Sequence, residues 1–236
     1  MKLLLLLIGL AQPAPVVPPA PASEAPASEA PASQAPVAGG LEVGAVVEGI
    51  QAFYAGAQDF QASFTQTYTY QIYDRKQVSH GTVYFKKPRR MRWDYQKPTP
   101  KVFVADGQTL WVYEPEESQV FKRDLKSAQI PAALAFMSGE GKLTDEFDAK
   151  LLESKDANTV RVELIPRHHA GDYKSLILNV DRATYAVKAS TVVDPVGNTN
   201  HLVFSGVKTN QNLPDKGFVF SPPAGVKVLA GGDDTP

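Results

Sequence analysis

From Phe60 onward, the sequence is a series of short runs in which apolar and polar residues alternate, with turn-forming residues between the runs. A period of two places successive side chains on opposite faces of a strand. Pairs such as Asp106-Gly107 and Pro214-Asp215 mark turns. Short, regularly spaced strands predict antiparallel pairing of sequence neighbours, and a sheet of this width tends to curl. The strands are expected at 60–73, 79–87, 89–96, 101–105, 109–114, 117–123, 146–153, 159–165, 174–180, 185–193, 199–208 and 218–220.

Two apolar-faced helices accompany these strands. Apolar residues between Leu41 and Tyr54 recur at helical spacing, which predicts one amphipathic helix. A second, short helix is expected in SAQIPAALAFMSGEG, where Pro131 fits a first turn and Gly139 fits a C-terminal cap. We therefore expect a mainly β domain with two or three short helices, which cover the concave face of one large antiparallel sheet. The apolar stripe of the second helix consists of Ile130, Leu134 and Met137.

The first 40 residues differ in composition from the rest of the chain. The apolar run from Leu3 to Ala11 follows a lysine and is shorter than the roughly 18 residues that cross a bilayer. This pattern is typical of a secretory signal peptide, which we assign to residues 1–18. Residues 19–40 contain repeats of APASE and APASQ without a large apolar group, so we expect a disordered, semi-stiff spacer. One globular domain is expected at 41–236.

Composition excludes several classes of protein. The chain has 236 residues, no cysteine and a formal net charge of −1. An exported protein without cysteine has no disulfide, so its stability must come from its core. It also has no cysteine that could carry a lipid anchor. Because the charge is close to zero, there is no general attraction to nucleic acid or acidic membranes, and no nucleic-acid partner is expected.

No residue pattern indicates catalysis. The sequence has neither a G-x-S-x-G nor an HExxH motif. His168-His169 precede a turn signal, so we interpret them as hairpin-tip residues and not as metal ligands. Glu114, Glu116 and Glu117 flank a proline in YEPEESQ, and we interpret them as solvated turn residues. We therefore expect no enzyme activity, no cofactor and no metal site.

The run KKPRRMRWDYQKP (Lys86 to Pro98) combines basic residues with bulky apolar ones. With alternating faces, Lys87 and Arg89 share a side of the strand with the apolar residues, while Arg90 and Arg92 point the other way, into water. The cations are thus split over two faces and form a poor phosphate-binding surface. An inward cation near a rim could bond the backbone carbonyls of a covering helix. The apolar face is formed by Val83, Phe85, Met91, Trp93 and Tyr95.

Two interpretations of this apolar face remain open. The side chains either form ordinary sheet core or line a hydrophobic cavity. Large aromatics on a sheet too wide for two short helices favour a cavity. The inward position of Lys87 also favours it, because a buried cation needs a polar partner. The alternation pattern alone does not separate the two.

Four ordered blocks of the sequence resemble the LolA family of lipoprotein carriers. They are FQASFTQ (60–66), GTVYFKKPRRMRWDYQKP (81–98), VADGQTLWVYEPEESQV (104–120) and LPDKGFVFSPPAGVKV (213–228). The resemblance covers about 41–228. It implies an unclosed antiparallel β-barrel, or half-barrel, enclosing a hydrophobic cavity that is lidded by helices.

The resemblance also implies a function. Members of the family are soluble periplasmic chaperones that take acylated lipoproteins from an inner-membrane ABC-type exporter and deliver them to an outer-membrane receptor, the lipoprotein LolB. Since this chain has no cysteine, it is similar to the carrier and not to the anchored receptor. We expect a monomer that is exported to the periplasm. A carrier or sensor of another lipid on the same fold is the alternative, and a ligand-free scaffold with a filled core is a third possibility.

Particular residues acquire roles through this resemblance. The family's K-R-P motif is Lys86-Lys87-Pro88 here, so Lys87 replaces the arginine that latches the lid, and Arg89 is a second latch candidate. Lysine keeps the charge but loses the planar fork of donors, so a weaker hold is expected. The lid helix is expected around Ile130, Leu134 and Met137. The lipid-binding cavity is expected to be lined by Phe64, Val83, Phe85, Met91, Trp93 and Leu110.

Overall fold

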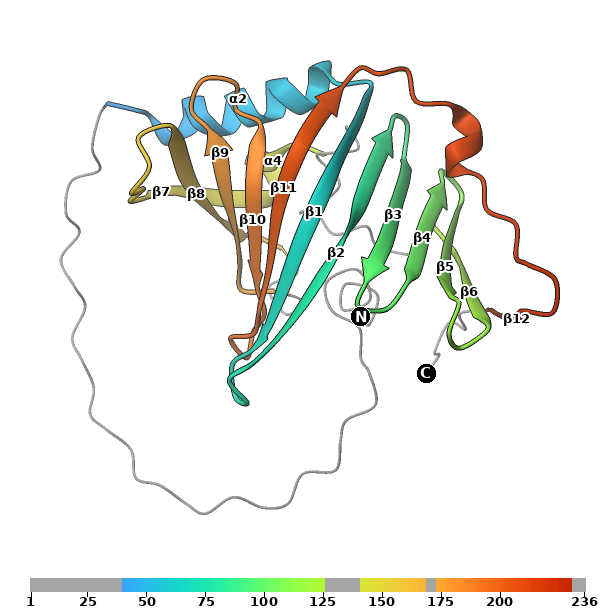
Figure 1. Ribbon diagram of the computed structural model, residues 1–236. Coiled ribbons are helices and arrows are strands. Elements are labelled where there is room, and N and C mark those ends of the chain that lie inside the picture. Colours follow the sequence, from blue (N-terminus) through green and yellow to red (C-terminus); the bar gives the residue numbers. More distant parts are fainter. Residues whose placement is uncertain (1–39, 126–140, 169–172, 231–236) are drawn as a thin grey trace, which may run out of the picture.

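The computed structural model describes residues 40–125, 141–168 and 173–230 (Figure 1). In this part of the chain, one sheet holds 12 strands in the order β12-β6-β5-β4-β3-β2-β1-β11-β10-β9-β8-β7. The predicted signal peptide (1–18), the spacer (19–40) except Gly40, and the predicted lid helix lie outside the described residues. The strands are β1 (Asp59–Tyr70), β2 (Arg75–Lys86), β3 (Arg90–Lys97), β4 (Lys101–Asp106), β5 (Thr109–Glu114), β6 (Gln119–Asp124), β7 (Phe147–Leu152), β8 (Thr159–Pro166), β9 (Ser175–Asp181), β10 (Val187–Val193), β11 (Thr199–Thr209) and β12 (Lys227–Ala230).

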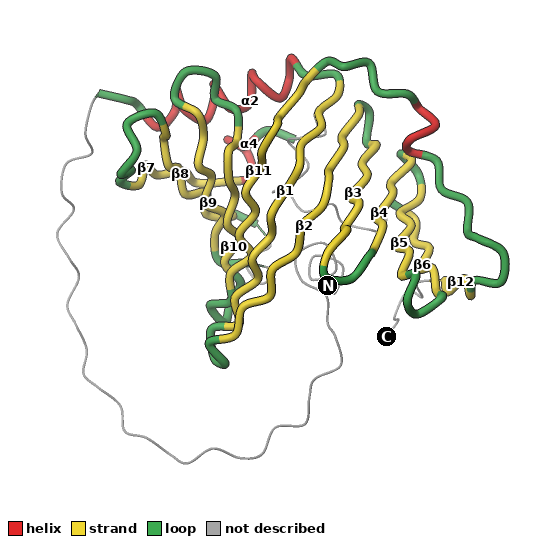
Figure 2. Tube along the Cα trace, viewed as in Figure 1, coloured by secondary structure: helices red, strands yellow, loops and turns green. Residues whose placement is uncertain are grey.

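The sheet is made of two antiparallel meanders. Strands β1 to β6 pair in sequence order, as do β7 to β11, and the pairing of β11 with β1 joins the two halves. Strand β12 pairs with β6 in parallel. Figure 2 shows one curved surface with β7 at one edge and β12 at the other, and these two edges do not pair. The prediction of an unclosed antiparallel β-barrel is therefore confirmed.

The predicted strands match the observed ones except at the C-terminal end. Residues 218–220 do not form a strand; instead, Asp215–Phe218 form the short 3-10 helix η1. Prolines at 214, 222 and 223 flank this stretch and lack the N–H donors with which a ladder could extend on either side. The last strand, Lys227–Ala230, was not predicted from the sequence.

Helix α2 (Val43–Gly56) confirms the helix predicted near the start of the domain. Its apolar residues at helical spacing give a buried stripe that includes Val46, Ile50 and Tyr54. Figure 1 shows α2 lying across one end of the sheet, next to β8–β11. A second described helix, α4 (Leu143–Glu146), is a single turn that leads into β7.

The outer face of β2 and β3 is not simply solvated, as the alternation suggested. Lys86 and Arg90 contact the carboxylate of Asp215, with N–O distances of 2.6 and 2.8 Å. Arg92 Nη1 donates a hydrogen bond to the carbonyl of Gly217 at 3.2 Å. The basic residues on this face therefore hold η1 and the C-terminal segment against the sheet.

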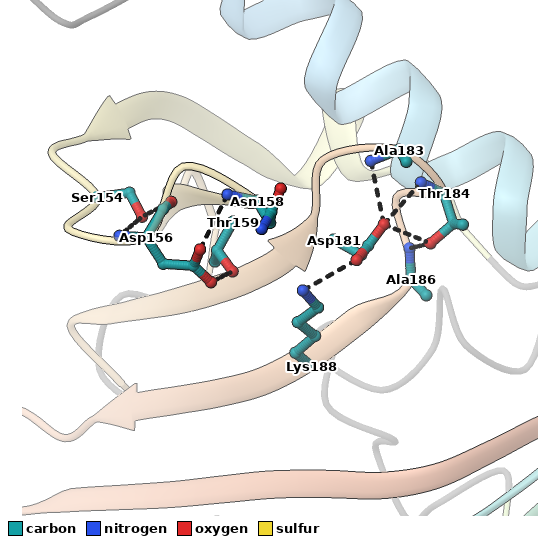
Figure 3. Close-up of polar contacts among 9 residues, drawn as sticks. All are labelled: Ser154, Asp156, Asn158, Thr159, Asp181, Ala183, Thr184, Ala186 and Lys188. Atoms are coloured by element: carbon teal, nitrogen blue, oxygen red, sulfur yellow. Dashed lines mark hydrogen bonds and ion pairs between the residues drawn. The ribbon is translucent and has the colours of Figure 1, made fainter.

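Two aspartates fix the β7–β8 and β9–β10 turns (Figure 3). Asp156 accepts hydrogen bonds from the hydroxyl of Thr159 and the backbone N–H of Asn158, at 2.7 and 2.9 Å, which lower its pKa. Asp181 pairs with Lys188 at 2.9 Å and also accepts from backbone N–H groups of the β9–β10 turn. These contacts lower the pKa of Asp181 to about 2. Both carboxylates are thus engaged as turn anchors.

Candidate functional site

The inner face of β1 to β5 brings together the six residues that were predicted to line a cavity. They all belong to one apolar cluster, and none is more than 4 % exposed. Strand register explains why they meet: Val83 lies opposite Trp93, and Phe85 lies opposite Met91. Paired residues in neighbouring strands point to the same face of a sheet. The six residues are Phe64, Val83, Phe85, Met91, Trp93 and Leu110.

Aromatic rings dominate this inner face. The ring of Phe64 contacts those of Trp93 and Tyr95, with centroid distances of 5.0 and 4.9 Å, both edge to face. Phe85 lies 6.1 Å from Trp93 in the same geometry. Edge-to-face packing is a favoured arrangement for aromatic pairs. The result is a continuous apolar wall that spans three strands.

A glycine makes room for the centre of this wall. Gly81 lies directly opposite Phe64 in the β1–β2 ladder. A Cβ atom at Gly81 would lie 2.7 Å from Cζ of Phe64, closer than real side chains approach each other. The Phe64 ring therefore lies over the bare backbone of Gly81.

The sequence interpretation missed several members of the inner face. Phe60 packs 6.0 Å from Phe85, and Phe204 lies opposite Phe64 in the register of β1 and β11. The signal was present, because alternation along β1 places Phe60, Ala62 and Phe64 on one side. The contribution of β11 was not foreseeable in the same way, since it depends on a pairing between distant parts of the chain.

One end of the inner face carries polar side chains. Gln66 Nε2 donates to Asn200 Oδ1 at 3.0 Å, and both residues are buried. Gln66 also has a hydrogen bond with Tyr95, whose pKa is raised by burial. These groups satisfy one another, as buried polar groups must. The inner face is therefore apolar along most of its length and polar near one end.

Lys87 connects the sheet to helix α2. Its Nζ donates hydrogen bonds to the carbonyls of Tyr54 and Ala55, both at 2.8 Å. These carbonyls belong to the last turn of α2, where helical carbonyls lack partners and a cation interacts favourably with the helix dipole. Burial lowers the pKa of Lys87. Arg89, the other predicted latch residue, lies in the following turn with φ of +56°.

Helix α2 has further attachments to the sheet. The hydroxyl of Tyr54 accepts a hydrogen bond from the backbone N–H of Val187 at 3.3 Å, and burial raises the pKa of Tyr54. A Cβ at Gly49 would lie 2.7 Å from the ring of Tyr185, so this ring packs directly on the helix backbone. Gln51 Oε1 accepts from the N–H of Leu143 at 3.0 Å. The predicted lid residues Ile130, Leu134 and Met137 lie in a stretch outside the described residues.

One of the residues considered for catalysis, Glu114, has structural partners. Glu114 is not a solvated turn residue: its carboxylate pairs with Lys101 at 2.5 Å and accepts from Gln119 at 2.7 Å. The side chains of Glu114 and Lys101 are 13 and 12 % exposed. Glu116 and Glu117 are exposed, as expected for a turn. Within the described ranges, His, Cys, Asp and Glu side chains form no group of three that could hold a metal ion.

A curved, unclosed sheet with an aromatic inner face and a helix fastened across one end defines the class of open half-barrel proteins. This chain belongs to the LolA family: the model described as "Outer membrane lipoprotein carrier protein LolA" matches residues 55–221. Among the described residues, no helix has both the length and the apolar character needed to cross a bilayer.

Named relatives agree with this family. A protein named outer-membrane lipoprotein carrier protein from Methylibium petroleiphilum is 31 % identical over 194 residues, which cover 82 % of this chain and 94 % of the relative. A protein of the same name from Neisseria meningitidis serogroup B is 30 % identical over 185 residues, covering 78 % of this chain and 86 % of that protein. An uncharacterized conserved protein from Thermus thermophilus shares the fold, with a TM-score of 0.53 and 13 % identity; the match covers 79 % of this chain and 98 % of that one.

Proposed function

We propose that this protein is a carrier of outer-membrane lipoproteins, which holds their acyl chains against the inner face of the half-barrel. Membership of the LolA family is the observation that carries this proposal, together with relatives that are named as carriers of this kind. The inner face suits the task because its aromatic and aliphatic side chains form one contiguous apolar cluster, which an acyl chain can contact when the elements that cover it move aside. Phe64, Val83, Phe85, Met91, Trp93 and Leu110 are the proposed lipid contacts.

The energetics of acyl-chain binding define what a carrier needs from its partners. Burial of hydrocarbon contributes about 0.8 kcal/mol per CH₂, so a chain of about 14 methylenes contributes on the order of 10 kcal/mol. Such a chain leaves a membrane slowly without outside work, and the sequence has no nucleotide-binding motif to supply that work. The proposed partners are therefore an inner-membrane ABC-type exporter that loads the carrier and a LolB-like outer-membrane receptor that unloads it. The proposed location is the periplasm.

Lys87 is the proposed latch of the closed state. Its two hydrogen bonds to the last turn of α2 tie this helix to the strand pair that carries the aromatic wall. A single ammonium group holds less firmly than a planar guanidinium fork, and a weaker hold favours the release of cargo. The helix around Ile130, Leu134 and Met137 remains the proposed lid. Gln51 of α2 contacts Leu143, close to the end of that segment.

Neighbouring residues on opposite faces provide the test of this function. A photo-crosslinking amino acid at position 93 is expected to capture acylated lipoproteins in cells, because this side chain lies on the inner face. The same amino acid at position 92 provides the matched control, because Arg92 faces outward and contacts Gly217. Capture at 92 and not at 93 would reject the inner face as the binding surface.

The identity of the bound lipid separates this proposal from its alternative. Mass spectrometry of extracts of the purified protein is expected to show acylated peptides. Free phospholipid or glycolipid without acylated peptides would instead indicate a carrier or sensor of another lipid on the same fold.

A further inference from the structure

One buried indole on the inner face has no hydrogen-bond acceptor among the described residues. Within that part of the chain, Nε1 of Trp93 makes no hydrogen bond, and the whole side chain is 3 % exposed. A buried donor without a partner destabilises the folded protein relative to a satisfied one. Such groups are rare in native proteins and often mark the place of a missing water or ligand.

The surroundings of Trp93 are apolar. Its ring packs edge to face on Phe64 and Phe85. In the neighbouring strands, the residues opposite Trp93 are Val83 and Phe103. Phenylalanine at position 93 would offer a similar apolar surface without an unsatisfied N–H. Packing therefore explains a large ring here but not its buried N–H.

The polar end of the inner face shows how this chain satisfies buried polar groups elsewhere. Gln66 and Asn200 are joined at 3.0 Å, and Gln66 also bonds Tyr95, which is only two residues from Trp93. The second tryptophan, Trp111, belongs to a different environment, with Phe220 at 5.7 Å and Lys122 Nζ at 5.2 Å from its ring. The buried indole without a described acceptor is thus on the face that is proposed to bind lipid.

We infer that Trp93 Nε1 donates a hydrogen bond to the carbonyl oxygen of an ester-linked acyl chain. This inference rests on the proposed function, because it takes the acyl chain to lie on the inner face. An acyl chain is apolar along its whole length except at its carbonyl group. An apolar wall with one donor matches that chemistry, since the wall contacts the methylenes and the donor pairs with the carbonyl. Trp93 thereby fixes how far along the wall the acyl chain lies.

Ester and ether lipids of equal chain length provide the test, because the ether lacks the carbonyl. Binding of 1,2-dioctanoylglycerol and of its diether counterpart, 1,2-dioctylglycerol, would be measured by calorimetry on the purified protein. The wild-type protein is expected to prefer the ester by about tenfold, the factor that a net hydrogen bond of about 1.4 kcal/mol provides. In the variant Trp93→Phe, the preference for the ester is expected to disappear, so that the two lipids bind with equal affinity.

Nuclear magnetic resonance of the indole N–H groups gives a readout that does not depend on a variant. The Trp93 indole proton is expected to shift downfield when the ester binds and to shift less with the ether. Trp111 is the internal control, and its resonance is expected to stay in place with both lipids.

The possible failures are distinguishable. Equal affinity of the wild-type protein for both lipids, with no ester-specific shift at Trp93, would overturn the inference and leave the carrier function intact. Failure of both lipids to bind would overturn the inference, and crosslinking at position 93 would then decide separately whether the proposed function stands.

Discussion

Replacing Lys87 by methionine removes both hydrogen bonds that join β2 to the last turn of α2, while most of the length of the side chain is kept. Hydrogen bonds from a charged donor contribute about 1.5–3 kcal/mol each when they are well buried. Lys87 is partly exposed, and water can reach the carbonyls of Tyr54 and Ala55 in the variant. Both bonds together should therefore contribute about 1–2 kcal/mol to the local stability of the end of α2.

Hydrogen–deuterium exchange of residues 43–56 measures this local stability directly. A loss of about 1–2 kcal/mol corresponds to exchange that is about 5 to 30 times faster in the last turn of α2. The variant Lys87→Arg should restore most of the protection, because it keeps a cation that can donate to helix carbonyls. The rate at which lipoproteins are transferred between membranes should also differ between Lys87→Met and the wild type, since the variant lacks the proposed latch.

Lys86→Met is the matched control for this experiment. Lys86 is the adjacent cation, but it lies on the outer face and pairs with Asp215. This control variant should expose the C-terminal segment to exchange and leave α2 unchanged. The reasoning is refuted if α2 exchanges at the wild-type rate in Lys87→Met, or if Lys86→Met loosens α2 to the same extent.

Three further substitutions test the packing and charge interactions of the fold. Gly81→Ala should destabilise the protein by about 1–3 kcal/mol in urea unfolding, because a Cβ would overlap the neighbouring backbone and an aromatic ring; Gly217→Ala, which has open space, should have little effect. Glu114→Gln should lower the free energy of unfolding by about 1–3 kcal/mol at neutral pH, because the largely buried ammonium of Lys101 then lacks its carboxylate partner. An unchanged stability would contradict the importance of this ion pair. Asp181 has a lowered pKa in the folded state, so its stabilising contribution is present above about pH 4 and is lost as the pH falls toward 2. The difference in stability between the wild type and Asp181→Asn should therefore shrink over that range in urea titrations, and a constant difference would argue against the assigned charge interaction.

Local periodicity was enough to predict the two faces of the central strands. In β2 and β3, the alternation that separates Phe85 and Trp93 from Arg92 is the same alternation that the burial pattern shows. Helix α2 was likewise predictable, because its apolar residues recur every three or four positions. These features depend on the backbone geometry of single elements.

Features that depend on contacts between residues far apart in the sequence were not predictable from the local sequence pattern. The outer face of β3 looked solvated, because nothing local reveals that Asp215 and Gly217 return to cover it. The partner of Lys87 could be foreseen only as some helix carbonyl, since the position of the end of α2 depends on the packing of the whole sheet. The unsatisfied Trp93 Nε1 was also invisible in the sequence, because hydrogen-bond satisfaction is a property of three-dimensional contacts.

The unpaired edges of the sheet, β7 and β12, have a mechanical consequence. In a closed β-barrel, every strand is hydrogen-bonded to two neighbours. Widening such a barrel therefore requires breaking the hydrogen bonds between two adjacent strands. Here the edge strands β7 and β12 are not hydrogen-bonded to each other. They can therefore move apart or closer together while the hydrogen bonds between adjacent strands stay intact. A change in curvature can thus alter the width of the inner face without breaking the backbone hydrogen bonds between adjacent strands.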